Sequence, residues 1–226
     1  MLRTNSSKPD SSATDATRRR YQRLSSLYDA MEGLAEQRYH PWRTKLWSQV
    51  PGLHILEAGI GTGKNMQFYP AGISITGIDL TPGMLQRAQK RASDLRLSSK
   101  VKLQLGDVQQ LDFPESEFDS AVATFVFCSV PDPVLGLCEL KRVVKPGGCV
   151  LLLEHMRSPN PLLGTVMDIL NPLILRMMGA NINRRTVDNV RRAGLEIEQI
   201  EDLGTGGIFK LIVARAPQHE VDLSKG

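Results

Sequence analysis

Hydrophobic residues follow a helical period in the first part of the chain. Apolar side chains recur at steps of three and four between residues 16 and 50, which predicts an N-terminal helical cap. A second short helix is expected over residues 40–49, with Pro41 in its first turn. Residues 1–15 are rich in Ser, Thr and Asp, so we expect them to form a disordered tail.

From residue 51 onward, short apolar runs alternate with helical segments. Strands are expected over residues 53–58, 73–79, 100–107, 118–127, 149–155, 196–204 and 208–216. Helices are expected directly after the glycines near residue 63 and over residues 81–97, 133–144 and 184–195. This alternation predicts an α/β domain over residues 51–216, with a mostly parallel sheet and helices on both faces. The last two strands lie too close together for a crossover helix, so they are expected to form an antiparallel edge hairpin. Residues 217–226 are expected to be a flexible tail.

The segment 158–183 interrupts this alternation. It is apolar, rich in Met and broken by prolines, and Asp168 and Arg176 are its only charged residues between Pro159 and Ile182. We interpret it as an insertion after the fifth strand. Met and Leu side chains adapt to greasy ligands, so the insertion is a candidate wall for the acceptor. A plain pair of core helices is the alternative.

Charge and cysteine content narrow the class of protein. The net charge of +4 is smaller than that of a dedicated nucleic-acid-binding domain, so no nucleic-acid partner is expected. The arginines near residues 18–23 and 184–192 suit an anionic membrane surface or a phosphorylated substrate, and solvated helix faces are the plainer alternative. Three cysteines without a CxxC pair indicate reduced thiols, and no metal site is expected. With no signal-peptide pattern and no long apolar stretch, we expect a cytoplasmic protein that is soluble or peripheral to a membrane.

The stretch "ILEAGIGTGKNM" at residues 55–66 contains the main candidate binding loop. A P-loop needs four residues between its glycines, whereas Gly59 and Gly63 have three between them. The dinucleotide fingerprint G-x-G-x-x-G requires a third glycine where this chain has Lys64. The pattern that remains is acid-x-G-x-G-x-G, formed by Glu57 and the glycines at 59, 61 and 63.

This pattern resembles motif I of the class I S-adenosylmethionine-dependent methyltransferases. The resemblance extends to Asp79, twenty residues after Gly59, and to Asp107 after "LQLG". It also includes "FPESEFDSAVATFVFCSV" and "RVVKPGGCVLLLEH", and so covers about residues 50–155 in the expected order. The resemblance implies a Rossmann-like seven-stranded fold and S-adenosyl-L-methionine as the cofactor.

The residues of motif I are suited to this cofactor. Glycines let the backbone approach a ligand closely, and a helix beginning after Gly63 would favour the cofactor's carboxylate. The negative charge of Glu57 suits an ammonium and a sulfonium. The resemblance places Asp79 at the ribose hydroxyls and Asp107 near the adenine amine. It further implies contacts with the cofactor by Tyr28, Leu80, Met84, Val108 and Phe125.

Each of these roles has a plainer alternative. Asp79 would otherwise be a turn residue that caps the next helix, and Asp107 would belong to an ordinary Gly-Asp turn. Tyr28 lies in a "YD" element seen in quinone-methylating and phospholipid-methylating branches of the family, and it is equally well explained as a core aromatic residue.

The acceptor is less clearly marked. "NMQFYP", "FVFCSV" and "LLLEH" are similar to the branch that contains bacterial phosphatidylethanolamine N-methyltransferases and alkyl-thiol S-methyltransferases. We therefore expect a small lipophilic or amphipathic acceptor, with a lipid amine or a thiol favoured. The candidate acceptor-pocket residues are Cys128, Asp168, Asn171, Arg184 and Arg185.

His155, at the end of the fifth strand, is the candidate general base, and a scaffold role is its alternative. Three further functions stay open. A quinone-type ring C-methyltransferase and an S-adenosylmethionine-binding sensor without turnover share the cofactor, whereas a nicotinamide-dependent oxidoreductase would bind NAD instead. The sequence does not indicate an oligomeric state.

Overall fold

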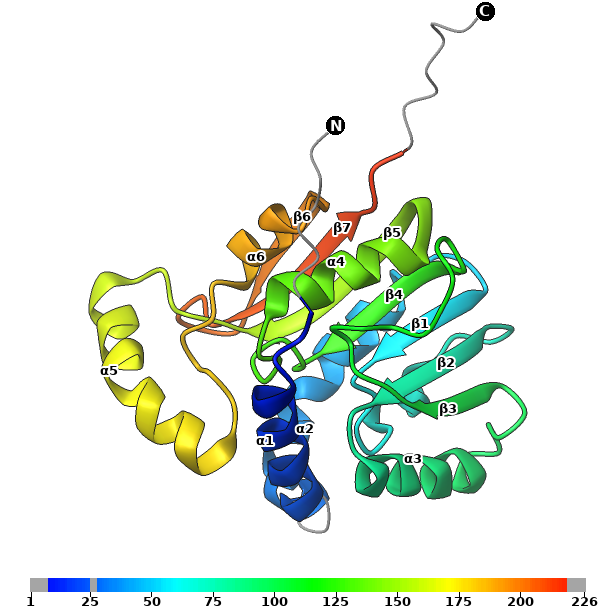
Figure 1. Ribbon diagram of the computed structural model, residues 1–226, viewed down its shortest axis with the longest axis horizontal. Helices are drawn as coiled ribbons and strands as arrows, with labels where there is room; N and C mark the ends of the chain where they lie inside the picture. The colour runs from blue at the N-terminus through cyan, green and yellow to red at the C-terminus, as the bar shows by residue number, and fades with distance from the viewer. Residues whose placement is uncertain (1–7, 25–27, 219–226) are drawn as a thin grey trace, which may run out of the picture.

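A seven-stranded sheet forms the centre of the molecule (Figure 1). The computed structural model describes residues 8–24 and 28–218. The strand order is β3-β2-β1-β4-β5-β7-β6, in which the first five are parallel and β7 runs antiparallel to both β5 and β6. This topology confirms the predicted mostly parallel sheet with an antiparallel edge pair. The strands are β1 His54–Ala58, β2 Ser74–Asp79, β3 Val101–Leu105, β4 Phe118–Thr124, β5 Val144–His155, β6 Glu196–Leu203 and β7 Phe209–Arg215.

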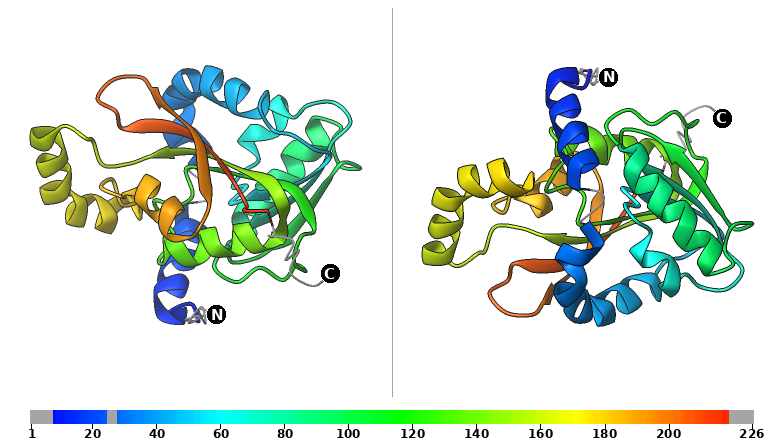
Figure 2. Two further views of the ribbon diagram at one scale, coloured as in Figure 1. Left: turned by 90° about the horizontal axis from the view of Figure 1, so that it is seen from above. Right: turned by 90° about the horizontal axis from the view of Figure 1, so that it is seen from below.

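Helices cover both faces of this sheet (Figure 2). Helices α4 and α6 pack on one face, whereas α2, α3 and the short helix η1 pack on the other. The helices are α1 Ser11–Leu24, α2 Tyr28–Trp47, η1 Lys64–Phe68, α3 Pro82–Asp94, α4 Pro133–Val143, α5 Pro161–Met178 and α6 Thr186–Arg192.

Alternation along the strands explains the two hydrophobic cores. In β1, Leu56 faces the α4 side and Ile55 faces the α2 side, where Leu46 and Trp47 pack. The central strands are covered on both faces, so they need no polar positions. Four consecutive residues of β5, 150–153, are completely buried, as the unbroken apolar run predicts.

The N-terminal region differs from its prediction. Helix α1 begins at Ser11, inside the segment predicted to be a tail, because Asp10 accepts hydrogen bonds from the N–H groups of Ser12 and Ala13 and so caps the helix. Helix α2 is continuous through Pro41, which was predicted to begin a new helix. Pro41 removes only one backbone hydrogen bond, and the residues after it pack firmly, with Trp42 against Phe209.

Two further segments also differ. The helix expected after the glycines is only the five-residue 3-10 helix η1, because Gly63 is left-handed with φ 80° and its carbonyl accepts from the Met66 N–H, three residues on. The segment 158–183 contains one helix, α5, with Pro172 inside it. It lies at the periphery of the molecule in all views and is not a pair of core helices (Figures 1 and 2).

Candidate cofactor and acceptor site

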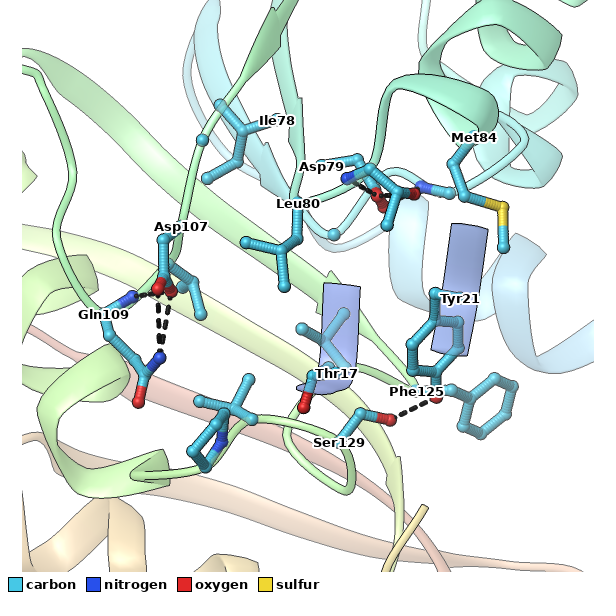
Figure 3. A pocket seen from close by; sticks show the side chains of 18 of the residues that line it. Thr17, Tyr21, Ile78, Asp79, Leu80, Met84, Asp107, Gln109, Phe125 and Ser129 are labelled. Atoms are coloured by element: carbon cyan, nitrogen blue, oxygen red, sulfur yellow. Dashed lines mark hydrogen bonds between the residues drawn. The ribbon is translucent and has the colours of Figure 1, made fainter. Parts of the chain in front are cut away.

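A cavity opens at the carboxyl ends of the central strands. It lies next to β1, which has β2 on one side and β4 on the other, so the strand order reverses at this point. Open parallel sheets bind their ligands at this switch in strand order. The cavity holds about 750 Å³, counting the part open to solvent. Figure 3 shows its lining, which includes Asp79, Asp107, Phe125 and two residues of α1.

The glycine loop, residues 59–63, exposes backbone atoms without side chains to the cavity at Gly59 and Gly61. Gly59 has φ 64°, and a Cβ there would lie 2.5 Å from a methyl carbon of Val126. Gly61 has φ 58°, and its Cβ would meet nothing nearer than a carbonyl oxygen at 4.0 Å, so this side is open. Both positions therefore require glycine, the first for packing and both for backbone conformation.

Asp79 is fixed at the end of β2 by three neighbouring donors. Its Oδ2 accepts from the Gly61 N–H at 3.0 Å, and its Oδ1 accepts from the N–H and hydroxyl of Thr81 at 2.9 and 2.8 Å. Thr81 is the N-cap residue of α3, but its hydroxyl donates to Asp79 and does not cap the helix. Burial raises the pKa of Asp79, and these hydrogen bonds act in the opposite direction.

Asp107 connects the sheet to the N-terminal helix. It accepts hydrogen bonds from the Gln109 N–H at 2.9 Å and from the Gln109 side-chain amide at 3.1 Å. The hydroxyl of Thr14, in α1, donates to the other carboxylate oxygen of Asp107 at 3.3 Å. The Gln109 amide also donates to Thr14, at 3.1 Å, so the three side chains form a closed triangle.

Helix α1 forms one wall of the cavity. Thr17 and Tyr21 line it, and the Tyr21 hydroxyl is hydrogen-bonded to the Ser129 hydroxyl on the opposite wall (Figure 3). Gln22 accepts a hydrogen bond from the Gly83 N–H at 3.0 Å, so α1 is also attached to the start of α3. We predicted a helical cap but did not include these residues among the site residues. The spacing of Thr14, Thr17 and Tyr21 at three- and four-residue steps was the available signal.

The chain reverses sharply after β4 to form the wall opposite α3. Phe125 has φ 57°, a left-handed conformation that costs about 1 kcal/mol or more outside glycine. Glu154 holds the turn, since its Oε1 accepts from the N–H groups of Val126 and Phe127 at 2.8 and 3.0 Å. Complete burial raises the pKa of Glu154 to about 8. Glu154 was not among the predicted site residues.

The structure places Glu57 behind the glycine loop, and it does not line the cavity. Only 1% exposed, it accepts from the Asn65 amide at 2.7 Å and from the Tyr69 hydroxyl. Burial raises its pKa to about 7, which weakens the negative charge expected of it at neutral pH. Gly63 likewise lies behind the loop, where an added Cβ would meet Met66 at 2.7 Å.

Among the remaining predicted cofactor residues, Leu80, Met84, Val108 and Phe125 line the cavity together with Gly59, Gly61, Asp79 and Asp107. Tyr28 begins α2, and its side chain lies outside the described part of the structure. Gln109 and Ser129 also line the cavity but were not predicted: Gln109 lies outside the quoted motifs, and Ser129 lies within "FVFCSV" but was not singled out.

None of the five predicted acceptor residues is among those that line the cavity. Asp168 is exposed and paired with Arg157, and Asn171 binds Asn181 and the Ile182 N–H on the inner side of α5. These contacts hold the insertion in place. Helix α5 packs at the edge of the molecule and does not fold over the sheet, so the acceptor role of these residues stays a prediction.

The other three acceptor candidates lie in loops or at a helix start outside the cavity lining. Cys128 is buried, and its carbonyl accepts from the N–H of Asn181. Arg184 is turned inward and donates to the Val130 carbonyl at 2.7 Å, and burial lowers its pKa. Arg185 is exposed at the N-terminus of α6. Arg184 therefore does not present its guanidinium to a headgroup.

His155 lies behind Phe125 and is not a lining residue. Its ring is stacked on Phe125 with centroids 6.4 Å apart and meets Phe209 edge-on at 6.5 Å. Burial lowers its pKa, although the neighbouring Glu154 acts in the opposite direction. A direct role as a base is thus not supported by its position.

The cavity fits the cofactor that the sequence resemblance implies. Glycine backbone, two carboxylates at successive strand ends and the apolar side chains between them can accommodate a charged nucleoside. Within the described residues, no cluster of three or more metal-ligating side chains occurs, and no helix has the length and hydropathy of a membrane-spanning segment.

Comparisons with known proteins agree with this geometry. A family model described as "Methyltransferase domain" matches residues 56–152. A phosphatidylethanolamine N-methyltransferase from Cereibacter sphaeroides is 34% identical over 149 residues, which cover 66% of this chain and 72% of that protein. The thiol S-methyltransferase TMT1B from Rattus norvegicus is 30% identical over 171 residues, which cover 70% of this chain and 69% of that protein.

Solved structures show the same fold at low identity. Geranyl diphosphate C-methyltransferase from Streptomyces coelicolor A3(2), in complex with Mg2+, geranyl diphosphate and S-adenosyl-L-homocysteine, superposes with a TM-score of 0.72. The match covers 92% of this chain and 99% of that chain at 15% sequence identity. At this identity the similarity concerns the architecture alone.

Proposed function

The chain belongs to the class I S-adenosylmethionine-dependent methyltransferases, and on that premise we propose that it methylates the amine of an amphipathic lipid of the phosphatidylethanolamine kind. The similarity to a phosphatidylethanolamine N-methyltransferase supports this acceptor over a thiol or a ring carbon. The observation that carries the proposal is a hydroxyl pair, Tyr21 and Ser129, set among the apolar residues Phe125, Val126 and Val130 at the cavity. Such a lining accepts N–H groups and excludes water.

We propose that the cofactor lies along the ends of β1, β2 and β3. Asp79 would accept hydrogen bonds from the ribose hydroxyls, and Asp107 would lie near the adenine amine. Leu80 and Val108 would enclose the base between apolar surfaces. When bound, S-adenosylmethionine supplies an electrophilic methyl group on a sulfonium centre.

The chain's own part in the reaction would be alignment. A neutral amine reacts through its lone pair, so its N–H groups must point away from the methyl group. The hydroxyl oxygens of Tyr21 and Ser129 can accept those N–H groups and orient the nitrogen. Alignment of this kind is worth about 7–11 kcal/mol of the barrier in favourable cases. The lipid ammonium would lose one proton to solvent before transfer, and the methylated ammonium would lose another afterwards, because neutral hydroxyls can relay a proton but cannot keep it.

Methyl transfer from radiolabelled S-adenosylmethionine to a panel of acceptors would test the proposal. The panel contains phosphatidylethanolamine in detergent micelles, an alkyl thiol and a quinol, with product identity read by mass spectrometry. We expect label on the lipid amine. Label on the thiol sulfur or on the quinol ring carbon would overturn the acceptor but retain the enzyme class. Saturable binding of S-adenosylhomocysteine with no turnover on any acceptor would instead support a sensor.

A further inference from the structure

Helix α5 presents a long apolar stripe to solvent. Leu162 is 82% exposed, Ile169 72% and Met177 69%, whereas apolar side chains on a surface helix normally face the core. Four further exposed residues, Leu163, Val166, Leu170 and Leu173, complete the set. At 100° per residue all seven fall within about one third of the helix circumference. The stripe therefore runs along one side of a helix about 27 Å long.

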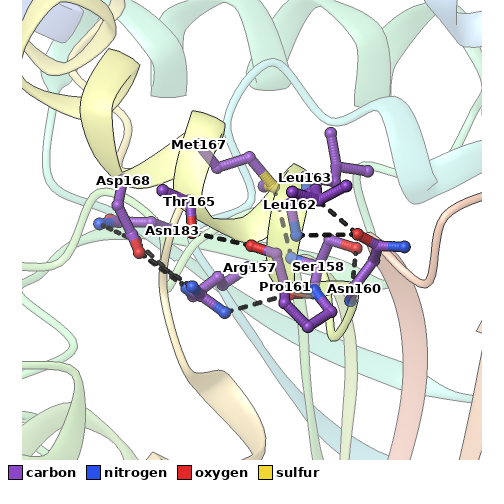
Figure 4. A network of polar contacts seen from close by, with 10 residues as sticks. All are labelled: Arg157, Ser158, Asn160, Pro161, Leu162, Leu163, Thr165, Met167, Asp168 and Asn183. Atoms are coloured by element: carbon purple, nitrogen blue, oxygen red, sulfur yellow. Dashed lines mark hydrogen bonds and ion pairs between the residues drawn. The ribbon is translucent and has the colours of Figure 1, made fainter.

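The opposite side of α5 is fixed to the protein by polar contacts, which Figure 4 shows. Asp168 is paired with Arg157 at 3.0 Å and accepts from the Asn183 amide at 3.1 Å. Asn160 caps the helix by accepting from the N–H groups of Leu162 and Leu163, and Met167 is buried beneath it. The helix is thus held with its apolar stripe pointing outward.

Cationic side chains lie next to this stripe. Arg176 is exposed within α5 and borders the apolar residues. At the end of the helix, Gly179 is in contact with Arg20 of α1, since an added Cβ would lie 2.4 Å from its side chain. Three- and four-residue spacings place Arg19, Arg20 and Arg23 on one side of α1. The apolar stripe is therefore bordered by positive charge at its C-terminal end.

We propose that α5 and the arginines of α1 form a docking surface for an anionic phospholipid bilayer. An apolar stripe bordered by arginines suits a helix that lies in the plane of the membrane interface. The apolar residues would enter the boundary between headgroups and acyl chains, and the arginines would meet anionic headgroups. A second copy of the chain is the alternative occupant, and parallel two-fold pairing through α5 would bring the same arginines together. The inference does not depend on the acceptor proposed above.

Co-sedimentation of the full chain with vesicles tests this surface. We expect binding to vesicles of phosphatidylglycerol and phosphatidylcholine in equal parts, and clearly weaker binding to phosphatidylcholine alone. The triple variant Leu162→Gln/Ile169→Gln/Leu173→Gln keeps the charge and the helix propensity, and should lower partitioning by about tenfold or more. The matched control Leu53→Gln/Leu95→Gln/Ile200→Gln removes exposed apolar side chains elsewhere and should bind vesicles like the unaltered protein.

The charged part of the surface is tested separately. Arg19→Gln/Arg23→Gln should weaken binding to the anionic vesicles by about fivefold for each arginine removed, with a smaller salt dependence. Equal vesicle binding by the stripe variant and its control would overturn the proposal, as would the absence of vesicle binding by the unaltered chain. A concentration-dependent dimer in lipid-free solution that the stripe variant abolishes would assign α5 to a second copy instead. Unchanged calorimetric affinity for S-adenosylhomocysteine would show that the variants are folded.

Discussion

The two halves of the site differ in how well their buried polar atoms are partnered. On the cofactor side, at the ends of β1, β2 and β3, the carboxylates of Asp79 and Asp107 have several donors each. On the acceptor side, at the ends of β4 and β5, three buried atoms of described residues lack a hydrogen-bond partner: Glu154 Oε2, Arg184 Nε and Thr186 Oγ1. The only other such atom in the described residues is Trp47 Nε1. Each unsatisfied buried group lowers the stability of the fold by about 1–3 kcal/mol, so the acceptor side is the less stable half of the site.

This difference teaches where specificity resides. On the cofactor side, Asp79 and Asp107 find their hydrogen-bond partners within a few local segments. This half of the site therefore does not depend on the acceptor and is compatible with many acceptors. The acceptor side depends on Glu154, whose carboxylate holds the turn at Phe125 while one of its oxygens stays unpartnered. The predictions below test the halves separately, beginning with the largest expected effect.

Asp79→Ala should lower the affinity for S-adenosylhomocysteine by about 100-fold or more. Two hydrogen bonds to a charged carboxylate are worth about 1.5–3 kcal/mol each, and the support of Gly61 is lost as well. Isothermal titration calorimetry measures the affinity, and thermal melting checks that the variant is folded. Asp94→Ala, which removes an exposed carboxylate paired only with Lys90, is the control. Unchanged affinity in Asp79→Ala would contradict the assignment of the cofactor side.

Stability should fall as the pH rises from about 5 toward 8. Burial holds the folded pKa of Glu57 at about 7 and that of Glu154 at about 8, above the ordinary value of 4.5. Between 4.5 and those values the folded state keeps protons that the unfolded state has released, so each group lowers the unfolding free energy by about 1.4 kcal/mol per pH unit. Urea titrations across this range measure the slope. The variant Glu57→Gln/Glu154→Gln should have a flatter profile, and an identical slope in both proteins would contradict the prediction.

Loosening α1 should have a moderate effect on the cofactor side. Thr14→Val/Tyr21→Phe removes the hydroxyls that bind Asp107 and Ser129, and each hydrogen bond contributes about 0.5–1.5 kcal/mol. We expect affinity for S-adenosylhomocysteine to fall about tenfold, measured by calorimetry. Thr44→Val, whose hydroxyl bonds only within α2, is the control and should keep the original affinity. Equal affinities in all three proteins would show that α1 does not contribute to binding.

His155→Ala should have the smallest effect, with kcat for the lipid amine reduced by less than about tenfold. The imidazole is separated from the cavity by Phe125, so it acts on the reaction only through packing. Steady-state kinetics with S-adenosylmethionine and micellar phosphatidylethanolamine measure the change. A larger loss, within the range of about 10²–10⁴ that a general acid or base contributes, with KM unaltered, would restore His155 as the base.

The sequence predicted the cofactor side well because its signals are local. Gly59, Gly61, Asp79 and Asp107 each lie at the end of a strand or within three residues after it, and the ends of neighbouring parallel strands meet at one edge of the sheet. Glu57 was misplaced because β1 alternates its side chains, so this residue faces the α2 side of the sheet and bonds Asn65.

The acceptor side was predicted poorly because its contacts are long-range. The inward turn of Arg184 toward Val130 and the position of α5 both depend on segments more than fifty residues apart meeting in space. From hydrophobic content alone, segment 158–183 was expected to line the acceptor or to form core helices. In the structure, Leu162 and Ile169 of α5 are exposed to solvent. Periodicity shows that a helix has an apolar side, but not what that side contacts.

The attachment of α1 has a kinetic consequence. Thr17 and Tyr21 lie over the cavity, and the helix is bonded at Asp107, Ser129 and Gly83. A spent nucleoside that leaves past this wall does so only when those contacts open. Along that route, the frequency with which the helix detaches limits turnover, however fast the transfer itself proceeds.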